Sequence, residues 1–389
     1  MTDRRRVLIV DDMPQNIRML GEALRADYEI NVATSGQKAL DIAFSSTPPD
    51  LILLDVMMPQ MDGYEVMQRL QANENTQSIP VIFVTAKDEE KDEEVGLKLR
   101  AVDYITKPIS LPIVKARVAN HMALLEARRE VQTAYNQLST EMDKMAALQK
   151  KLMPNSDYRD DHTIISGMYR PSGKASGDYY DFFRMDDRLR LVVADVSGHG
   201  ARAAFIVGLV RSVFHASRTT RMGLADIADI INRQLLDSVG EEGDFVTMIA
   251  ADIHTDTGYI DFINAGHCPG ILRTSTNDFV HLESQTAMLG LFEAEFEAQA
   301  IQPGETFSLF LYTDGIYEWF IAPEELYGAN RFVQRIENEL SKNALHHAND
   351  VPGIVAADAK STPRFEDDLT ALFIQFSTTS IGTHDEPAA

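Results

Sequence analysis

Residues 113–153 contain neither glycine nor proline, and this stretch separates two parts of the chain with different apolar patterns. Glycine and proline often end a helix, so their absence predicts one long helix over residues 112–153. The part before this stretch alternates short apolar runs with helical segments, whereas the part after it is rich in strand signals. The chain has 389 residues, which is enough for two domains with separate cores. We therefore predict two domains joined by a helical linker.

The predicted helix carries an apolar residue at every seventh position. These residues are Leu124, Val131, Leu138, Met145 and Leu152. The companion stripe is half polar and consists of His121, Arg128, Tyr135, Met142 and Gln149. This pattern fits a helix that packs on its own domain, and it also fits a parallel coiled coil between two copies of the chain. The second interpretation predicts a homodimer through residues 112–153.

The first part of the chain has the pattern of a doubly wound α/β domain. Between residues 7 and 113 the apolar runs VLIV, LILLD, VIFVT and DYIT alternate with helical segments. That alternation is typical of a parallel sheet with crossover helices.

The part after residue 153 predicts a mixed α+β domain. Its candidate strands are RLVVAD, FVTMIAAD, YIDFINA, FSLFLYTD and LTALFIQF, and its candidate helices cover residues 201–219 and 224–238. We expect stacked sheets flanked by helices over residues 154–376. The polar tail, residues 377–389, lacks a periodic apolar pattern and is expected to be disordered.

The composition argues against several classes of function. The formal net charge is −23 and no cluster of Lys and Arg compensates it, so we expect neither nucleic acid nor a membrane as a partner. The basic start precedes only four apolar residues, too few for a signal peptide, and no later apolar run reaches membrane-spanning length. The only cysteine, Cys268, excludes an intrachain disulfide and fits a reducing compartment. We expect a cytoplasmic protein.

Reactive side chains follow the apolar runs of the first domain. Asp11 and Asp12 follow VLIV, and Asp55 ends LILLD, so their carboxylates should meet at the carboxyl edge of the sheet and hold Mg²⁺. Thr85 ends VIFVT and Lys107 follows DYIT, which adds a hydroxyl and an ammonium to bind phosphoryl oxygens. Any one of these acids could instead cap a helix or form a turn. Together, at matching strand ends, they predict a phosphoryl acceptor with Asp55 as nucleophile.

The motifs VLIVDD, LILLDVMMPQMDGYE, VTA and DYITKP resemble the receiver domain of two-component response regulators over residues 1–120. The resemblance implies a flavodoxin-like, five-stranded parallel sheet. It also implies that a histidine kinase or phosphotransfer protein phosphorylates Asp55, and that Mg²⁺ binds Asp11, Asp12 and Asp55. Thr85 and Lys107 would read out the phosphate, and Tyr104 would be the switch side chain that turns inward with Thr85.

A second acidic set comes from four distant segments of the later domain. It consists of Asp178 in SGDYYDFF, Asp195 in VVADVSGHG, Asp314 in LYTDGIYE and Asp367 in FEDDLTALF. Neighbouring glycines would let backbone approach a cation, and the Val196 carbonyl could be a ligand. Two Mg²⁺ or Mn²⁺ ions in such a site would support hydrolysis of a phosphomonoester. Taken singly, each motif is an ordinary turn signal.

The order of the motifs resembles the PPM family of metal-dependent serine/threonine phosphatases, protein phosphatase 2C-like, in its SpoIIE-type branch. The resemblance begins at LQKKLMP and YRPSGKASGDYYDFF and continues to EDDLTALFIQF, over residues 149–376. It implies that Asp195 bridges two metals, that the Val196 carbonyl binds one, and that Asp178, Asp314 and Asp367 complete the other. Asp368 would support these ligands from behind.

Two details depart from the family pattern. Ser176 stands where relatives usually have glycine, although the small side chain should keep the turn. Larger eukaryotic relatives hold the phosphate with arginine, and the nearest basic candidate here is Lys174, which could equally be a surface lysine.

The resemblances together imply a response regulator whose phosphorylation controls a serine/threonine protein phosphatase. Relatives of this branch dephosphorylate anti-sigma factor antagonists, which implies a partner-switching pathway. An alternative is a non-catalytic adaptor that binds a sigma-pathway partner, but a decayed site should have lost at least one buried acid. A DNA-binding regulator would need a helix-turn-helix segment, for which the sequence gives no signal.

Overall fold

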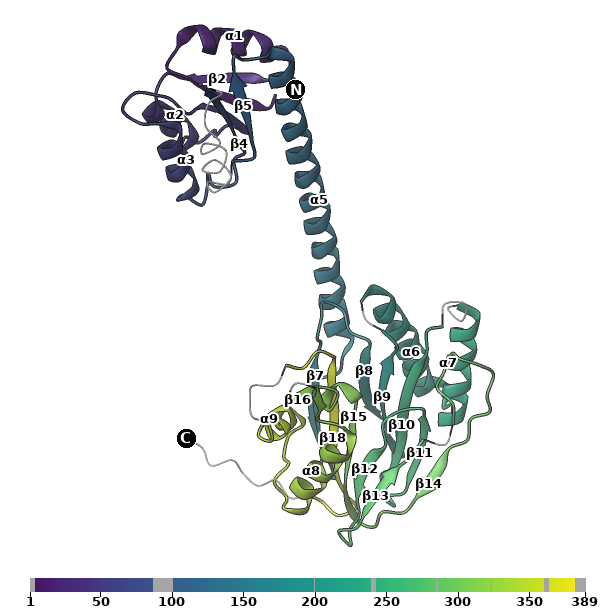
Figure 1. Cartoon of the computed structure of the whole chain (residues 1–389). Helices are drawn as coiled ribbons and strands as arrows, with labels where there is room; N and C mark the ends of the chain where they lie inside the picture. Colours follow the sequence, from purple (N-terminus) through teal and green to yellow (C-terminus); the bar gives the residue numbers. More distant parts are fainter. Residues whose placement is uncertain are drawn as a thin grey trace. The chain divides into compact units, whose positions relative to one another are not determined.

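The computed structural model describes residues 4–86, 101–198, 200–238, 243–284, 286–322, 324–359 and 364–381. The chain divides into two compact units, Met1–Asn136 and Gln137–Ala389, which are described separately (Figure 1). Among the described residues, no helix combines the length and the apolarity that crossing a membrane requires.

The first unit is a parallel five-stranded sheet in the order β2-β1-β3-β4-β5. Its strands are β1 (Arg6–Val10), β2 (Glu29–Ala33), β3 (Leu51–Asp55), β4 (Val81–Ala86) and β5 (Asp103–Lys107), and its described shorter helices are α1 (Pro14–Leu24), α2 (Gly36–Ala43) and α3 (Gly63–Gln71). This strand order is the flavodoxin-like doubly wound order. The predicted fold class of the first domain is therefore confirmed.

Both faces of this sheet are buried, which explains the continuous apolar runs. In β3, Ile52 and Leu54 join the core under α2 and α3, while Leu51 and Leu53 join the core on the opposite face. Side chains alternate between the faces of a strand, so one run of apolar residues supplies both cores.

The long helix α5 runs from Leu111 to Leu152, as the absence of glycine and proline predicted. Its first turns contribute Val114, Val118 and Met122 to the core of the receiver-like sheet. Farther along, Leu124, Val131 and Leu138 are 67%, 70% and 65% exposed. The apolar stripe of this middle part is therefore exposed, and the coiled-coil dimer stays a prediction.

The second unit contains two stacked antiparallel sheets and a small two-stranded sheet. The first stacked sheet has the order β14-β11-β10-β9-β8, and the second has the order β13-β12-β15-β18-β7-β6. The strands are β6 (Asp157–Arg159), β7 (Thr163–Arg170), β8 (Asp178–Arg184), β9 (Arg188–Val196), β10 (Val246–His254), β11 (Ile260–Ala265), β12 (Gly270–Arg273), β13 (Phe279–Leu282), β14 (Gln299–Ile301), β15 (Thr306–Tyr312), β16 (Phe320–Ala322), β17 (Glu325–Leu326) and β18 (Leu369–Ser377). The sequence pattern predicted β9, β10, β11, β15 and β18, and it missed the other strands of this unit.

Helices cover the outer faces of this sandwich, as predicted (Figure 1). They are α6 (Ala201–Thr220), α7 (Leu224–Ser238), α8 (Ala329–Ser341) and α9 (Val351–Ala356), with 3-10 turns at Asp314–Ile316 and Ala348–Asp350. On β9, Val192 and Ala194 pack toward α6 and α7, whereas Leu191 and Val193 pack between the sheets. The alternation creates separate cores above, between and below the two sheets. Residues 382–389 of the expected disordered tail lie outside the described residues, and β18 ends at Ser377.

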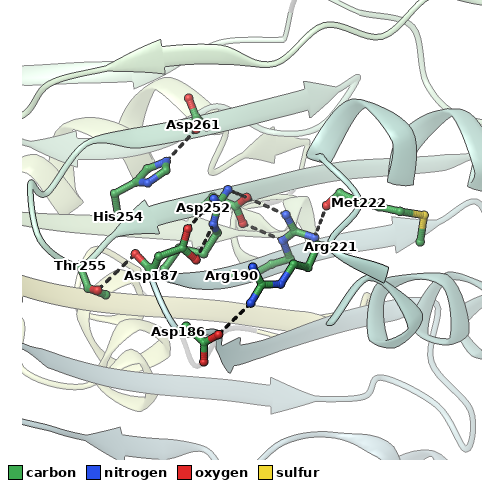
Figure 2. A network of polar contacts seen from close by, with 10 residues as sticks. Asp186, Asp187, Arg190, Arg221, Met222, Asp252, His254, Thr255 and Asp261 are labelled. Carbon is green, nitrogen blue, oxygen red and sulfur yellow. Dashed lines mark hydrogen bonds and ion pairs between the residues drawn. The ribbon is translucent and has the colours of Figure 1, made fainter. Parts of the chain in front are cut away.

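A polar network joins β9, β10 and the segments around them (Figure 2). Arg190 and Asp252 face each other across the two strands, and Nε and Nη2 of Arg190 each donate to Asp252 at 2.7 Å. Both side chains are almost fully buried, and Nη1 of Arg190 also donates to the carbonyl of Met222 at 2.9 Å. Nearby, Arg221 and Asp186 form an ion pair whose side chains are 74% and 89% exposed.

The two ion pairs should differ strongly in their contribution to stability. Asp252→Asn would leave the Arg190 charge buried without a counter-charge, so we expect the free energy of unfolding to fall by about 3–5 kcal/mol. Asp186→Asn breaks only the exposed pair and should leave it unchanged within error. Urea unfolding followed by fluorescence of Trp319, the only tryptophan and a buried residue of this unit, measures both. Equal effects of the two substitutions on the free energy of unfolding would contradict the conclusion that only the buried ion pair contributes strongly to stability.

Candidate functional sites

The carboxyl ends of the parallel strands bring the first set of acids together. Asp55 ends β3, and Asp11 and Asp12 follow β1, its neighbour in the sheet. Asp11 and Asp55 are almost fully buried, and a carboxylate oxygen from each of the three acids lies within 4.8 Å of the others. Oxygen ligands at this spacing suit a hard divalent cation such as Mg²⁺. The donor set therefore fits the cation that the sequence predicts.

Lys107 reaches into this cluster from the end of β5. Its Nζ atom lies 2.9 Å from Asp55 Oδ2 and 3.2 Å from Asp11 Oδ2. Burial raises the pKa of Asp55, and the bond from Lys107 opposes that rise. Burial also lowers the pKa of Lys107, but its bonds and charge interactions with Asp55 and Asp11 outweigh this effect, so the pKa is raised. The ammonium is thus held in its charged form beside the expected phosphoryl acceptor.

The two expected switch residues lie on adjacent strands. Thr85 is half-buried near the end of β4 and pairs in register with Thr106, the residue before Lys107. Tyr104 is on β5 and 38% exposed, with the Arg117 guanidinium 5.9 Å from its ring centre. The aromatic ring therefore lies at the surface, and its inward movement on phosphorylation stays a prediction.

The second set of acids gathers at one end of the sandwich. Asp178 begins β8 and pairs in register with Asp195 near the end of β9. Asp314 begins the 3-10 turn after β15, and Asp367 precedes β18, which pairs with β15. Thr313 links the two sheets because its hydroxyl donates to Asp178 Oδ2 at 2.8 Å. Segments that are distant in sequence thus converge, as the sequence required.

Two glycines permit this close approach. A Cβ on Gly177 would lie 2.7 Å from the Val196 carbonyl oxygen, and a Cβ on Gly315 would lie 2.1 Å from the Asp368 carbonyl oxygen. Neither distance is possible for a real side chain, so the motifs around Asp178 and Asp314 need glycine for contact rather than for turning alone. The sequence analysis had also allowed the simpler reading of ordinary turns.

Burial, together with mutual repulsion, raises the pKa values of the clustered acids. Burial, followed by the negative charges of Asp314 and Asp367, raises the pKa of Asp195 to about 8. Burial and the charge of Asp195 raise the pKa of Asp178 well above its usual range. Burial, Glu318 and Asp367 raise the pKa of Asp314 to about 6. An added positive charge would relieve this repulsion, so the donor set fits divalent cations.

The two acidic clusters differ in spacing. Within the described parts of the chain, ligand atoms of three such residues within 4.8 Å of one another occur only at Asp11, Asp12 and Asp55. The acids of the second cluster are therefore spread over a wider volume. A wider spread suits more than one cation, which is what the resemblance implies.

Asp368 holds the loop that precedes Asp178. Its Oδ1 accepts hydrogen bonds from the backbone and the hydroxyl of Ser172 at 2.7 and 2.9 Å, and its Oδ2 accepts one from Gly177 N at 2.9 Å. Ser176, where relatives have glycine, uses its hydroxyl to accept the Asp178 N–H at 3.0 Å. The departure from the family pattern therefore adds a bond next to an expected metal ligand.

The side chain of Lys174 contacts α5. Its ammonium lies 3.0 Å from the Ser139 carbonyl and 2.8 Å from Asp143 Oδ1, both on α5. The surface-lysine interpretation therefore fits its contacts better than the phosphate-binding one. Sequence reasoning also missed Thr313 and Gln149, which touch the Asp178 segment. Their only signal was position, next to Asp314 and within the motif LQKKLMP.

Each of the two units matches a known family model. Residues 7–119 match the family model of the response regulator receiver domain, and residues 185–377 match that of stage II sporulation protein E (SpoIIE). The chain therefore contains a response regulator receiver domain followed by a SpoIIE-type phosphatase domain.

Curated relatives and a solved structure are similar to parts of the chain. A probable cyclic di-GMP phosphodiesterase of Vibrio cholerae is 42% identical over 36% of this chain and 33% of its own. Response regulator PleD of Caulobacter vibrioides is 45% identical over 29% of this chain and 25% of its own. The chain thus spans a third or less of these relatives. The SiaA-PP2C domain of Pseudomonas aeruginosa has 17% identity and a TM-score of 0.53 over 63% of this chain and 99% of its own, which supports the fold.

The raised pKa of Asp195 predicts how pH affects the metal-free protein. A carboxyl whose folded pKa is raised contributes stability below its unfolded value, near pH 4, and loses it as the pH rises to about 8. In EDTA, the melting temperature of the phosphatase unit should therefore fall between pH 6 and 8. Asp195→Asn removes the charge and should raise the free energy of unfolding at pH 8 by at least about 1 kcal/mol. This corresponds to a melting temperature that is roughly 2–4 °C higher.

Added Mn²⁺ should make the melting temperature of wild type higher than that of Asp195→Asn, because Mn²⁺ stabilises wild type and not the variant. Asp256→Asn, an exposed acid of the same unit, is the control and should behave as wild type. Thermal scans that monitor Trp319 fluorescence give the answer. A variant that is less stable than wild type in EDTA at pH 8 would show that repulsion is not the dominant effect.

Proposed function

We propose that this protein is a response regulator in which phosphorylation of Asp55 controls a metal-dependent serine/threonine protein phosphatase. The observation that carries the proposal is the convergence of Asp178, Asp195, Asp314 and Asp367 at one end of a PP2C-like sandwich, in the chain of a receiver domain. A histidine kinase or a phosphotransfer protein is the expected phosphodonor.

In the receiver, Asp55 is the nucleophile. One of its carboxylate oxygens would form a bond to phosphorus while the bond from phosphorus to the donor breaks. Mg²⁺, held by Asp11, Asp12 and Asp55, would supply positive charge for the transfer. Lys107 Nζ now lies 2.9 Å from Asp55 Oδ2. After phosphorylation it would instead form an ion pair with a phosphoryl oxygen.

In the phosphatase domain, the acids would hold two Mn²⁺ or Mg²⁺ ions, which supply the charge that polarises a phosphoryl group and acidifies water. Asp195 would contact both ions, the Val196 carbonyl one of them, and Asp178, Asp314 and Asp367 the other. Thr313 fixes the orientation of the Asp178 carboxylate through its 2.8 Å hydrogen bond. The reaction breaks the bond between phosphorus and the seryl or threonyl oxygen, and water supplies the new oxygen on phosphate.

The proposed substrate is a phosphorylated anti-sigma factor antagonist. The support is the match of residues 185–377 to the SpoIIE family model, together with the motif order that resembles this branch. A non-catalytic adaptor is disfavoured because buried carboxylates that bind nothing are costly to keep together. The raised pKa values of Asp178, Asp195 and Asp314 reflect that cost.

Helix α5 is the proposed connection between phosphorylation and activity. Its first turns share a core with the receiver sheet, and its exposed stripe of Leu124, Val131 and Leu138 recurs every seventh residue. Such a stripe suits a parallel coiled coil with a second copy of the chain. Phosphorylation of Asp55 would change the position of α5 or the arrangement of the dimer, and this change would alter the turnover of the phosphatase domain.

The catalytic proposal predicts Mn²⁺-dependent hydrolysis of a generic phosphomonoester by the full chain, and loss of that activity in EDTA. Asp195→Ala and Asp314→Ala should each lower kcat by more than about a hundredfold. Loss of a residue that only supports a metal ligand costs up to about a hundredfold, and loss of a ligand itself should cost more. Asp256→Ala, at an exposed acid, should match wild type. Hydrolysis that survives in both cluster variants would remove the catalytic proposal.

The regulatory proposal predicts that a small phosphodonor such as acetyl phosphate changes turnover and oligomeric mass in wild type but not in Asp55→Asn. A change of about fivefold in turnover is expected, at the lower end of typical coupling between sites. Asp41→Asn, at an exposed acid of α2, should respond as wild type does. Light scattering and a phosphatase assay on the same samples test this, and equal values for phosphorylated wild type and Asp55→Asn would contradict the coupling.

A further inference from the structure

A buried glutamine of α5 is hydrogen-bonded to the loop that carries Asp178. Gln149 is 5% exposed, and its Nε2 atom donates to the carbonyl of Ser176 at 2.9 Å. In return, Ser176 N–H donates to Gln149 Oε1 at 3.2 Å. The side-chain amide therefore pairs with both polar groups of one backbone residue, which fixes the distance and the orientation between helix and loop.

The loop that Gln149 holds is attached to the expected metal ligands. Ser176 lies two positions before Asp178, and its hydroxyl accepts the Asp178 N–H at 3.0 Å. The next residue, Gly177, accepts a hydrogen bond from Val196 N–H at 3.2 Å and donates its own N–H to Asp368 at 2.9 Å. A displacement of Ser176 would therefore move Asp178 and the backbone beside Val196 together.

Burial makes this pair of hydrogen bonds hard to replace. Ser176 is fully buried, so bulk water does not reach its backbone groups. A buried N–H or C=O without a partner costs about 1–3 kcal/mol, so the loop would move to recover a partner. The geometry of the neighbouring ligands would then change.

A second contact between α5 and the same loop lies nearer the middle of the helix. Lys174 binds the carbonyl of Ser139 and the carboxylate of Asp143, with its side chain 43% exposed. This contact is at the surface and salt-screened, so it contributes little by itself. Gln149 is the buried attachment, and it determines where the loop lies against the helix.

We propose that Gln149 is a positioning residue of the phosphatase site, which sets cation affinity by holding the Ser176–Gly177–Asp178 segment through its amide. The proposal rests on the proposed metal-dependent phosphatase function and deepens it, because it makes cation binding depend on the position of α5. Loss of a residue that supports metal ligands typically weakens metal binding by about 10–100-fold.

The test compares Gln149→Ala with Gln132→Ala, an exposed glutamine of the same helix, in the full chain. All proteins carry Asp11→Asn, which removes a ligand from the receiver so that the heat of Mn²⁺ binding reports the phosphatase site. Isothermal titration should give a Kd for Mn²⁺ about 10–100-fold higher for Gln149→Ala than for the control. The Mn²⁺ concentration for half-maximal hydrolysis should rise by the same factor, while kcat recovers at saturating Mn²⁺.

A second variant covers the case in which Gln149→Ala does not fold. Gln149→Glu keeps the shape and the bond from Ser176 N–H, but its carboxylate cannot donate to the Ser176 carbonyl, and it should also weaken Mn²⁺ binding. A purely structural role would lower the melting temperature in EDTA and leave the Mn²⁺ Kd within twofold of the control, which would overturn the proposal. If the parent protein neither binds Mn²⁺ at this site nor hydrolyses phosphomonoesters, the proposed function fails, and the role of Gln149 with it.

Discussion

Repulsion among buried carboxylates is the constraint on which the phosphatase unit depends. Asp195 has neighbours of like charge in Asp314 and Asp367, and burial prevents water from weakening their interaction. The surrounding residues respond by approaching closely: glycines at 177 and 315 remove side chains from the contact, and Thr313 donates to Asp178. The fold thus maintains an arrangement that is unfavourable by itself, and bound cations would relieve its repulsion.

The receiver meets the same constraint with a different solution. Lys107 supplies a positive charge within 3.2 Å of both Asp11 and Asp55, and the cluster needs only one further cation. In the phosphatase unit, neutral hydrogen-bond donors orient the acids, and Asp368 is fully engaged by Ser172 and Gly177. One chain therefore contains a compact acidic cluster that includes a lysine and a second acidic cluster that is more widely spaced.

The ends of apolar runs allowed most of both sites to be predicted, because strand ends in a sheet bring reactive residues to one edge. Other parts were beyond the sequence pattern. β8 contains the charged residue Asp181, which interrupts its apolar pattern. Asp181 is nevertheless buried, and its carboxylate is hydrogen-bonded to Tyr179 at 2.8 Å and to His215 at 2.7 Å. Gln149 fell on the half-polar stripe of a heptad, and periodicity indicates a face of a helix but not a partner 27 residues away. Lys174 was near Asp178 in sequence, yet its contacts are on α5.

The last described strand has a consequence for the making of the protein. β18 lies between β15 and β7 in its sheet, and Asp367 and Asp368 immediately precede it. Until β18 has been translated, β15 and β7 lack the strand that lies between them. The acidic cluster of the phosphatase unit lacks Asp367 until the same stage. A product that ends before residue 367 therefore lacks Asp367, Asp368 and the strand between β15 and β7, although it still contains the receiver domain.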